Sequence, residues 1–444
     1  MSLIAADKHY CVVGLGMTGV SCVRYLAARG KSFSVIDSRQ NPPGLDEITR
    51  DFPDVTVLTG RFDEAFLARA NTLVMSPGVA LATPEIQTAI KNGAQVTSDI
   101  ELFLSEFSGQ VIAITGSNAK STVTRWMGLA LENGNKKALI GGNIGNAVLD
   151  HVDEAFDVAV LELSSFQLEL LPKLNADVAC VLNISEDHLD RYDSMAHYQQ
   201  AKQRIYFGTQ HAVFNRADVM TAPLVPDSVK VTSFALDEPD LNQYGVRLEN
   251  NQRVICKGFE SIMTVNELAL PGEHNIANAM AVIALADAVD NDRQATISAL
   301  KTFSGLPHRC EEVGTIDGVR YFNDSKSTNV GSTLAAINGL GKPEKNIVLL
   351  LGGQGKNQDF SPLVNAVAAV CKKVICFGED GEALSRLISG SLLVETMNQA
   401  LDLAKTIAES GEIVLLSPAC ASFDQFKNFE ARGNEFVTWV ETAK

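Results

Sequence analysis

The sequence predicts an α/β protein with three domains. Its 444 residues are too many for a single hydrophobic core, and about three domains of ordinary size are expected. Apolar strand-like runs alternate with helical patterns along the whole chain, which is typical of parallel sheets covered by helices. Because this pattern breaks near residues 97–99 and 304–309, we expect domains at residues 1–98, 99–305 and 306–444.

Each domain repeats the alternation. The first contains the runs YCVVGLG, FSVID and TLVMSPG, with helical stretches at residues 19–29 and 84–92. The second contains VIAITGSNAKST, VAVLELSS and VACVLNIS, a strand-and-turn region at 210–270 and an apolar helix at 274–288. The third contains VRYFNDS, NIVLLLGG, KVICFG, LLVE and EIVLLSP. We therefore expect Rossmann-like first and third domains on either side of a central parallel-sheet domain.

Composition and charge exclude several classes of protein. The formal net charge of −16 argues against a nucleic-acid partner, which would require clustered Lys and Arg. The eight cysteines have no zinc-type spacing, and their scatter suits reduced, mostly buried thiols. No signal-type start and no membrane-length apolar run are present. We expect a cytoplasmic protein with no membrane partner.

The sharpest chemical signal is ITGSNAKST at residues 114–122. An apolar strand runs into a small-residue loop that is followed by a lysine, two hydroxyls and a helix. Backbone N–H groups at a helix start can hold phosphates, Lys120 can neutralise their oxygens, and Ser121 or Thr122 can offer a hydroxyl to Mg²⁺. The loop is shorter than a standard Walker A. The plain alternative is a strand–turn–helix with a solvated lysine. We expect a central domain of P-loop ATPase type that binds ATP through Gly116, Ser117, Asn118, Ala119, Lys120, Ser121 and Thr122.

Acidic and histidine side chains follow two other strands of the central domain. Glu162 ends one apolar run, and Asp187 and His188 follow another. Ligands gather at the carboxyl ends of parallel strands, so these groups could meet the phosphate loop and form a shell for Mg²⁺. Each one alone would more often be a solvated loop residue or a helix cap.

The first domain carries a complete GxGxxG at residues 14–19, between a strand and a helix. Asp37 ends the next strand, about where a ribose-binding acid belongs. Read alone, this pattern predicts an NAD-dependent dehydrogenase. A UDP-sugar also carries a diphosphate and a ribose, so the same turn fits that ligand. The SPG turn at residues 76–78 could meet the nucleotide or could be an ordinary turn.

Two polar loops follow strands of the third domain, NDSKSTN at residues 323–329 and LGGQGKNQDF at 351–360. With a later hydroxyl, they supply the cations and donors that a dicarboxylate amino acid would need. Any one of these lysines could instead be solvated. The residues concerned are Lys326, Thr328, Lys356 and Ser422. Cys420 has no base beside it in the sequence, so we interpret it as a packed thiol.

These motifs together resemble the Mur ligases and the folylpolyglutamate synthases, which form amides through acyl phosphates. The resemblance starts at TGSNAKST and extends along nearly the whole chain, most specifically at SPACASFDQFKNFEARG, residues 417–433. Ala119 and Gln354 depart from the family's commoner Gly and Asp. The other motifs that carry the resemblance are LELSSFQLE, NISEDHLDRY, AKQRIY, GEHNIANA, HRCE and NDSKSTN.

The resemblance implies an ATP-dependent ligase that adds D-glutamate to UDP-N-acetylmuramoyl-L-alanine, with the third domain closing on the second. It implies that Lys120, His188 and Lys202 are catalytic, and that Ser121, Glu162, His188 and a carbamylated Lys202 hold one or two Mg²⁺ ions. Without it, Lys202 would be interpreted as a surface lysine. A monomer is expected, and a non-catalytic nucleotide-binding scaffold is the less favoured alternative. The further contacts implied are Asn275, Asn278, Arg309 and Asp324 for ATP; Met17, Thr18, Asp37, Ser38, Arg39, Gly78, Asn143 and Gln167 for the UDP-sugar; and Lys326, Thr328, Lys356, Ser422 and Phe429 for D-glutamate.

Overall fold

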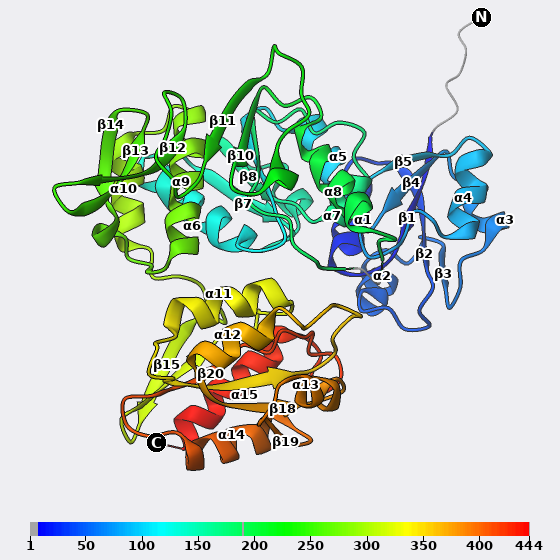
Figure 1. Cartoon of the computed structure of the whole chain (residues 1–444). Coiled ribbons are helices and arrows are strands. Elements are labelled where there is room, and N and C mark those ends of the chain that lie inside the picture. The colour runs from blue at the N-terminus through cyan, green and yellow to red at the C-terminus, as the bar shows by residue number, and fades with distance from the viewer. Residues whose placement is uncertain (1–7, 189–190, 444) are drawn as a thin grey trace, which may run out of the picture.

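The computed structural model describes residues 8–188 and 191–443. It contains three sheets, each with helices against it, in the order N-terminal, central and C-terminal domain (Figure 1). Two positions of the sequence motif NISEDHLDRY, residues 189 and 190, lie outside the described residues. The predicted three-domain α/β architecture is confirmed.

The N-terminal domain has a five-stranded, all-parallel sheet in the order β3-β2-β1-β4-β5. Helix α1 begins at Met17, two residues before the predicted start, because the glycine turn ends at Gly16. The strands are β1 (His9–Val13), β2 (Ser32–Asp37), β3 (Val57–Thr59), β4 (Thr72–Met75) and β5 (Gln95–Thr97), and the helices are α1 (Met17–Ala28), α2 (Leu45–Asp51), α3 (Glu64–Leu67) and α4 (Pro84–Lys91).

The central domain has a nine-stranded sheet in the order β14-β13-β12-β11-β10-β9-β6-β8-β7. Its inner strands are continuous apolar runs with both faces buried, as parallel strands covered by helices require. The strands are β6 (Gln110–Thr115), β7 (Ala138–Gly142), β8 (Val158–Glu162), β9 (Val178–Val181), β10 (His211–Asn215), β11 (Lys230–Phe234), β12 (Tyr244–Glu249), β13 (Gln252–Lys257) and β14 (Glu260–Thr264). The helices are α5 (Asp99–Glu106), α6 (Lys120–Asn133), α7 (Ser165–Glu169), α8 (Met195–Gln203), α9 (Glu273–Ala288) and α10 (Arg293–Thr302).

The C-terminal domain has a six-stranded sheet in the order β15-β16-β20-β17-β18-β19, parallel except for β15. Figure 1 shows this domain, yellow to red, as a separate body below the other two. The strands are β15 (Glu311–Ile316), β16 (Val319–Asn323), β17 (Ile347–Gly352), β18 (Cys371–Phe377), β19 (Leu392–Leu393) and β20 (Ile413–Leu416), and the helices are α11 (Val330–Leu340), α12 (Leu363–Val370), α13 (Gly381–Leu387), α14 (Met397–Ile407) and α15 (Phe429–Thr442).

The N-terminal and central domains share a buried apolar cluster, and the C-terminal domain has clusters of its own. One buried cluster runs through both the N-terminal and the central domain, whereas the two clusters of the C-terminal domain contain only residues beyond 309. Among the described residues, no helix combines the length and the apolar character that a membrane span needs. Cys420 is fully buried, as expected for a packed thiol.

Candidate functional site

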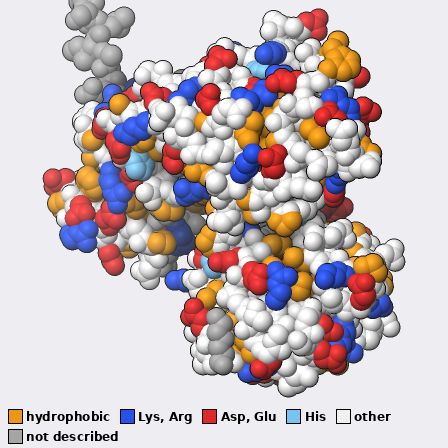
Figure 2. Space-filling model, turned by 90° about the vertical axis from the view of Figure 1, so that its left-hand side faces the viewer, with side chains coloured by type: hydrophobic (Ala, Val, Ile, Leu, Met, Phe, Trp, Pro, Cys, Tyr) orange, Lys and Arg blue, Asp and Glu red, His pale blue; other side chains and the backbone are white. Residues whose placement is uncertain are grey.

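A large cleft with many polar and charged side chains in its walls lies between the central and the C-terminal domain. It has a volume of about 1380 Å³, and its walls are loops at the carboxyl ends of strands from both sheets. Figure 2 shows the C-terminal domain as its own lobe, joined to the rest at a narrower waist. Parallel strands of two sheets therefore bring their ligand-binding edges to one space.

The phosphate loop forms one wall of the cleft. The Lys120 ammonium donates hydrogen bonds to the carbonyls of Gly116 (2.7 Å) and Ser117 (3.0 Å). Burial lowers the pKa of Lys120, although Glu162 and nearby carboxylates oppose the shift. Ala119 adopts φ 65° at the start of α6, so the departure from Gly places an alanine in the left-handed region. No side chain caps this helix start, so its N–H groups are available to an anion.

Three predicted metal ligands lie along the same wall. Glu162 is 2% exposed; its Oε1 accepts from Asn143 Nδ2 (2.9 Å), and its Oε2 is buried without any hydrogen-bond partner. Such an orphaned carboxylate oxygen, in a cleft that Ser121 and His188 also line, suits a Mg²⁺ ion. Among the described residues, no group of three or more His, Cys, Asp and Glu side chains is arranged to hold a metal, so a metal here depends on hydroxyl, phosphate or modified lysine oxygens as well.

Lys202 is buried at 1% exposure, and the alternative of a surface lysine is wrong. Its ammonium donates to the Gly116 carbonyl (2.9 Å) and lies 4.7 Å from the centre of the Tyr198 ring. Burial, reinforced by Lys120, lowers the pKa of Lys202 well below its ordinary value. A neutral amine in this position is a nucleophile for carbon dioxide.

Asp187 and His188 follow β9 and point into the cleft. Burial lowers the pKa of His188 against the opposing effect of Asp187, which keeps the imidazole neutral near pH 7. For Asp187, burial acts to raise the pKa, but His188 and the two lysines Lys356 and Lys120 hold it below its ordinary value. Lys356 Nζ lies 3.7 Å from Asp187 Oδ1 across the cleft.

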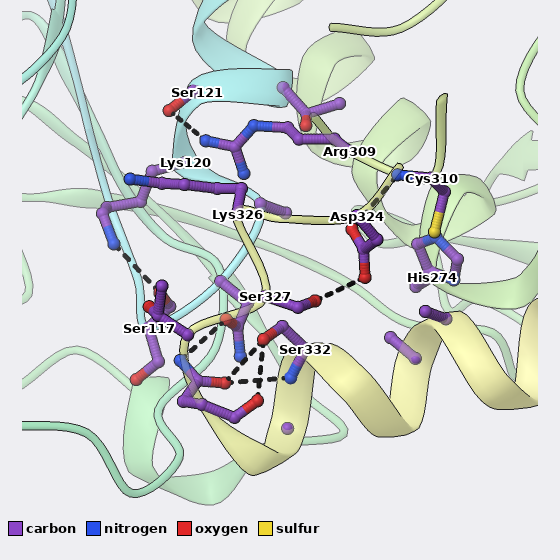
Figure 3. Close-up of a pocket in the computed structure, with 18 of the residues that line it drawn as sticks. Ser117, Lys120, Ser121, His274, Arg309, Cys310, Asp324, Lys326, Ser327 and Ser332 are labelled. Atoms are coloured by element: carbon purple, nitrogen blue, oxygen red, sulfur yellow. Dashed lines mark hydrogen bonds between the residues drawn. The ribbon is translucent and has the colours of Figure 1, made fainter. Parts of the chain in front are cut away.

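The C-terminal wall contributes cations and buried acids. Arg309 donates from Nη2 to the Ser121 hydroxyl (2.7 Å), and Figure 3 shows Lys326 lying alongside Lys120 near this pair. The Lys326 ammonium lies 3.9 Å from the centre of the Phe429 ring, and burial, with Arg309 and Lys120, lowers the pKa of Lys326 to about 8. Burial raises the pKa of Asp324 to about 6, although it accepts hydrogen bonds from two serines and a backbone N–H.

The structure brings together most of the residues predicted for ATP, metal and amino acid. Gly116, at the start of the phosphate loop, does not line the cleft. Its carbonyl oxygen accepts hydrogen bonds from Lys120 and Lys202. The cleft is lined by Ser117, Asn118, Ala119, Lys120, Ser121, Thr122, Asn143, Glu162, His188, Lys202, Asn275, Asn278, Arg309, Asp324, Lys326, Thr328, Lys356, Ser422 and Phe429.

The residues predicted for the UDP-sugar lie mostly elsewhere. Asp37 uses one carboxylate oxygen to accept from Leu15 N–H (2.7 Å) and pairs with Arg39 (2.6 Å), so it stabilises the glycine turn. Ser76 donates to the Gly14 carbonyl (3.0 Å), which places the SPG turn with Gly78 against that turn. Met17 is exposed at the start of α1. Thr18, Ser38 and Gly78 also belong to this domain and do not line the cleft.

Gln167 is buried and serves as a helix cap. Its Oε1 accepts from the Ser164 N–H (3.1 Å), and the Ser164 hydroxyl accepts from the Gln167 N–H (3.2 Å) at the start of α7. Sequence reasoning missed Ser185, Asn329 and Gly331, which shape the cleft near the phosphate loop. Of these, only Asn329 had a visible signal, because Asn before an apolar run is a common helix N-cap.

Comparison with known proteins agrees with this geometry. Family models match residues 8–98 (Mur ligase MurD-like, N-terminal domain), 114–286 (Mur ligase middle domain) and 308–420 (Mur ligase, glutamate ligase domain). The chain belongs to the Mur ligase family. This finding contradicts the dehydrogenase alternative.

Within the family, the chain is similar over its whole length to ligases that carry D-glutamate in their names. It is 47% identical to the UDP-N-acetylmuramoylalanine--D-glutamate ligase of Pseudomonas fluorescens strain Pf-5, with 99% of each chain covered. Two solved structures share the fold: UDP-N-acetylmuramate-alanine ligase MurC of Thermotoga maritima (TM-score 0.62, 18% identity, 98% of this chain and 100% of that chain) and MurF ligase of Thermotoga maritima in complex with ADP (TM-score 0.59, 15% identity, 98% of each).

Proposed function

We propose that this chain is an ATP-dependent ligase that joins D-glutamate to the carboxylate of UDP-N-acetylmuramoyl-L-alanine through an acyl phosphate. The observation that carries the proposal is the cleft itself: a phosphate loop on one wall faces ammonium and hydroxyl groups on the other. The full-length similarity to D-glutamate ligases supports the choice of substrates.

In the first step, a carboxylate oxygen of the UDP-linked substrate forms a bond to the γ-phosphorus of ATP. The bond from that phosphorus to the β–γ bridging oxygen breaks, and ADP leaves. Lys120 can exchange its hydrogen bonds to the carbonyls of Gly116 and Ser117 for hydrogen bonds to phosphate oxygens. Arg309, which donates to the hydroxyl of the neighbouring Ser121, adds a second cation. Charge stabilisation of this kind is the main route of phosphoryl transfer. Asn275, Asn278 and Asp324 also line the cleft and are proposed to bind the nucleoside.

Mg²⁺ fits at Ser121, Glu162 and His188, where it would neutralise charge on the phosphate oxygens. Lys202 can join this shell only after modification. Its neutral amine would form an N–C bond with carbon dioxide and lose a proton, which converts a cation into a carbamate anion. The low pKa of Lys202 and its burial support this conversion.

In the second step, the D-glutamate amine attacks the acyl carbon, and the bond to the phosphate oxygen breaks. A base near the amine is proposed to accept the proton that the amine loses. His188, whose imidazole burial keeps neutral, can take this role only while it does not hold the metal. Lys326, Thr328, Lys356 and Ser422 would hold the two carboxylates of D-glutamate. The Phe429 ring, which lies against the Lys326 ammonium, would pack beside the amino acid.

The UDP end of the substrate is proposed to bind at the N-terminal domain. No side chain caps the start of α1, so its N–H groups could bind the diphosphate, beside Met17 and Thr18. Asp37, Ser38, Arg39 and Gly78 are proposed as further contacts of the UDP end, and Asn143, which lines the cleft, as a contact of the sugar part. Gln167, which caps α7, is proposed as a further contact of the UDP-linked substrate. We propose further that the chain acts as a cytoplasmic monomer.

The decisive experiment measures phosphate release from ATP with UDP-N-acetylmuramoyl-L-alanine and either D-glutamate, L-glutamate, L-alanine or no amino acid. Release that requires D-glutamate is the expected result. The Lys120→Ala variant should lose at least about 100-fold in turnover, the size of effect seen when one charge-stabilising donor is removed. Equal release with every amino acid, or normal turnover in Lys120→Ala, would refute the proposal.

The carbamate has its own test. Lys202→Ala should be inactive, and short carboxylates added to the solution should restore part of the activity without any need for bicarbonate. Mass spectrometry of the wild type under carbon dioxide should show a labile gain at Lys202. Full activity of Lys202→Ala without additives would remove the carbamate from the mechanism.

A further inference from the structure

Asn329 reaches across the cleft from the C-terminal domain to the phosphate loop. Its Nδ2 donates to Asn118 Oδ1 (3.1 Å) in the loop and to Asp187 Oδ2 (3.2 Å) after β9. Its Oδ1 accepts from the Ser332 N–H (2.9 Å) and so caps α11. One buried amide group therefore caps a helix of one domain and bonds two residues of the other.

Gly331 lets the same helix start approach closely. A Cβ atom at this position would lie 3.1 Å from Ser185 Oγ and 3.2 Å from Asn118 Nδ2, which is tighter than ordinary van der Waals contact. Figure 3 shows Ser332 on the first turn of α11, on the side that faces the phosphate-loop residue Ser117. The first turn of α11 is thus fitted to the loop as well as bonded to it.

The start of α11 is also tied to the proposed amino-acid loops of its own domain. The Val330 N–H donates to Gln358 Oε1 (3.0 Å), and Gln358 Nε2 donates to the carbonyls of Gly355 (2.9 Å) and Ala419 (2.8 Å). Lys356 in this loop faces Asp187, the residue that Asn329 also contacts. Moving the helix start would move these loops relative to the phosphate loop.

We infer that Asn329 is a positioning residue that seats the C-terminal domain on the phosphate loop and aligns the amine-binding loops with the phosphoryl-transfer site. Its effect on turnover depends on the proposed ligase function, whereas its effect on domain seating does not. The UDP-sugar would be bound through the other domain joint, so its affinity is independent of Asn329.

The test uses variants that keep the helix cap, because Ser and Asp cap helices about as well as Asn. Asn329→Ser removes the reach across the cleft and should lower kcat about tenfold, the effect of a lost hydrogen bond of about 1.4 kcal/mol. Asn329→Asp places a carboxylate against Asp187 and should lower kcat about 100-fold, because like charges in contact are costly. In both variants the Kd for UDP-N-acetylmuramoyl-L-alanine should stay within about twofold of wild type, whereas solution scattering should show a larger radius of gyration.

Exchanging the side chains of Asn329 and Asp187 tests their contact directly. In the double variant Asn329→Asp with Asp187→Asn, the new amide can donate to the new carboxylate, so kcat should recover at least about tenfold over Asn329→Asp alone, and the radius of gyration should return toward that of wild type. Asn338→Asp is the matched control, because it adds the same charge at an exposed position of the same helix. It should behave as wild type in all three measurements.

The outcomes separate a failure of this inference from a failure of the proposed function. Normal kcat and normal scattering in Asn329→Asp would show that the contact does not seat the domain. No recovery in the exchanged pair would show that Asp187 acts separately. If wild type releases no phosphate with D-glutamate but the scattering arms behave as expected, the proposed function fails and the seating role of Asn329 stands.

Discussion

The two joints between the three domains are built from different interactions. At the first joint, Leu26 of the N-terminal domain belongs to the same buried apolar cluster as Phe103 and Leu149 of the central domain. Around this cluster, Arg29 pairs with Glu106 (2.6 Å) and with Asp153 (2.8 Å) of the central domain. The second joint has polar contacts from Arg309, Asn329 and Lys356 across an open cleft.

The difference indicates which domain moves. Apolar burial stabilises the first joint whether or not a ligand is present. Hydrogen bonds that face a polar cleft can be exchanged for bonds to water or ligand at little net cost. We therefore expect the N-terminal and central domains to behave as one body, and the C-terminal domain to open and close against it, excluding water from the acyl phosphate when closed.

The largest expected effect comes from breaking the shared core. Phe103 is fully buried in the first joint, and Phe103→Ala should lower the free energy of unfolding by about 3–5 kcal/mol. Because the cluster spans both domains, calorimetry should show the N-terminal and central domains unfolding together at a lower temperature. The C-terminal transition should not move.

The matched control is Phe436→Ala, which empties a fully buried position in a C-terminal cluster. It should shift only the C-terminal transition. If either substitution moves both unfolding transitions equally, the C-terminal domain is coupled to the central domain as strongly as the N-terminal domain is. The contrast between the two joints would then be wrong.

A smaller effect is expected in the cleft, from the protonation of Lys326. Its pKa of about 8 means that the free enzyme carries the charged ammonium below pH 8 and loses it above. Since the charged form is the one that binds a carboxylate, kcat/KM for D-glutamate should fall about tenfold per pH unit above 8, relative to a Lys326→Arg variant that stays charged. The ratio of the two enzymes cancels the ionisation of the D-glutamate amine. A ratio that stays flat from pH 7 to 10 would remove Lys326 from carboxylate binding.

The sequence predicted the sheets and several residues of the cleft, but not the contacts between the domains. The apolar runs predicted the sheets, and strand-end position correctly suggested that Glu162 and His188 meet Lys120, because parallel strands place their carboxyl ends together. The family resemblance, and no pattern, pointed to Lys202, since a lysine on a short helix gives no sign of burial. The sequence could suggest Asn329 as a helix N-cap, but not its contacts across the cleft, because these join residues 211 and 142 positions away in the chain.

Helix caps and close approaches were also invisible. The capping role of Gln167 competes with any ligand contact, and only the local geometry of α7 reveals it. Gly331 looks like any helical glycine until Asn118 and Ser185 are placed beside it. Spacing predicts which elements form, but contacts between domains depend on how whole domains are oriented.

The smallest expected effect concerns backbone strain, which also differs between the joints. Among the described residues of the N-terminal domain, every residue with positive φ is a glycine, whereas Ala119, His188 and Lys356 line the cleft with φ between 54° and 65°. The left-handed region costs a non-glycine residue about 1–2 kcal/mol. A glycine removes this strain from the folded state, but it also raises the conformational entropy of the unfolded chain, which offsets part of the stabilisation. Ala119→Gly should therefore raise the free energy of unfolding by no more than about 1 kcal/mol. Ala130→Gly in the regular part of α6 should lower it, because there glycine loses entropy and leaves a cavity. Denaturant unfolding of both variants measures the difference, and a loss of stability in Ala119→Gly would show that the phosphate loop is not strained at this position.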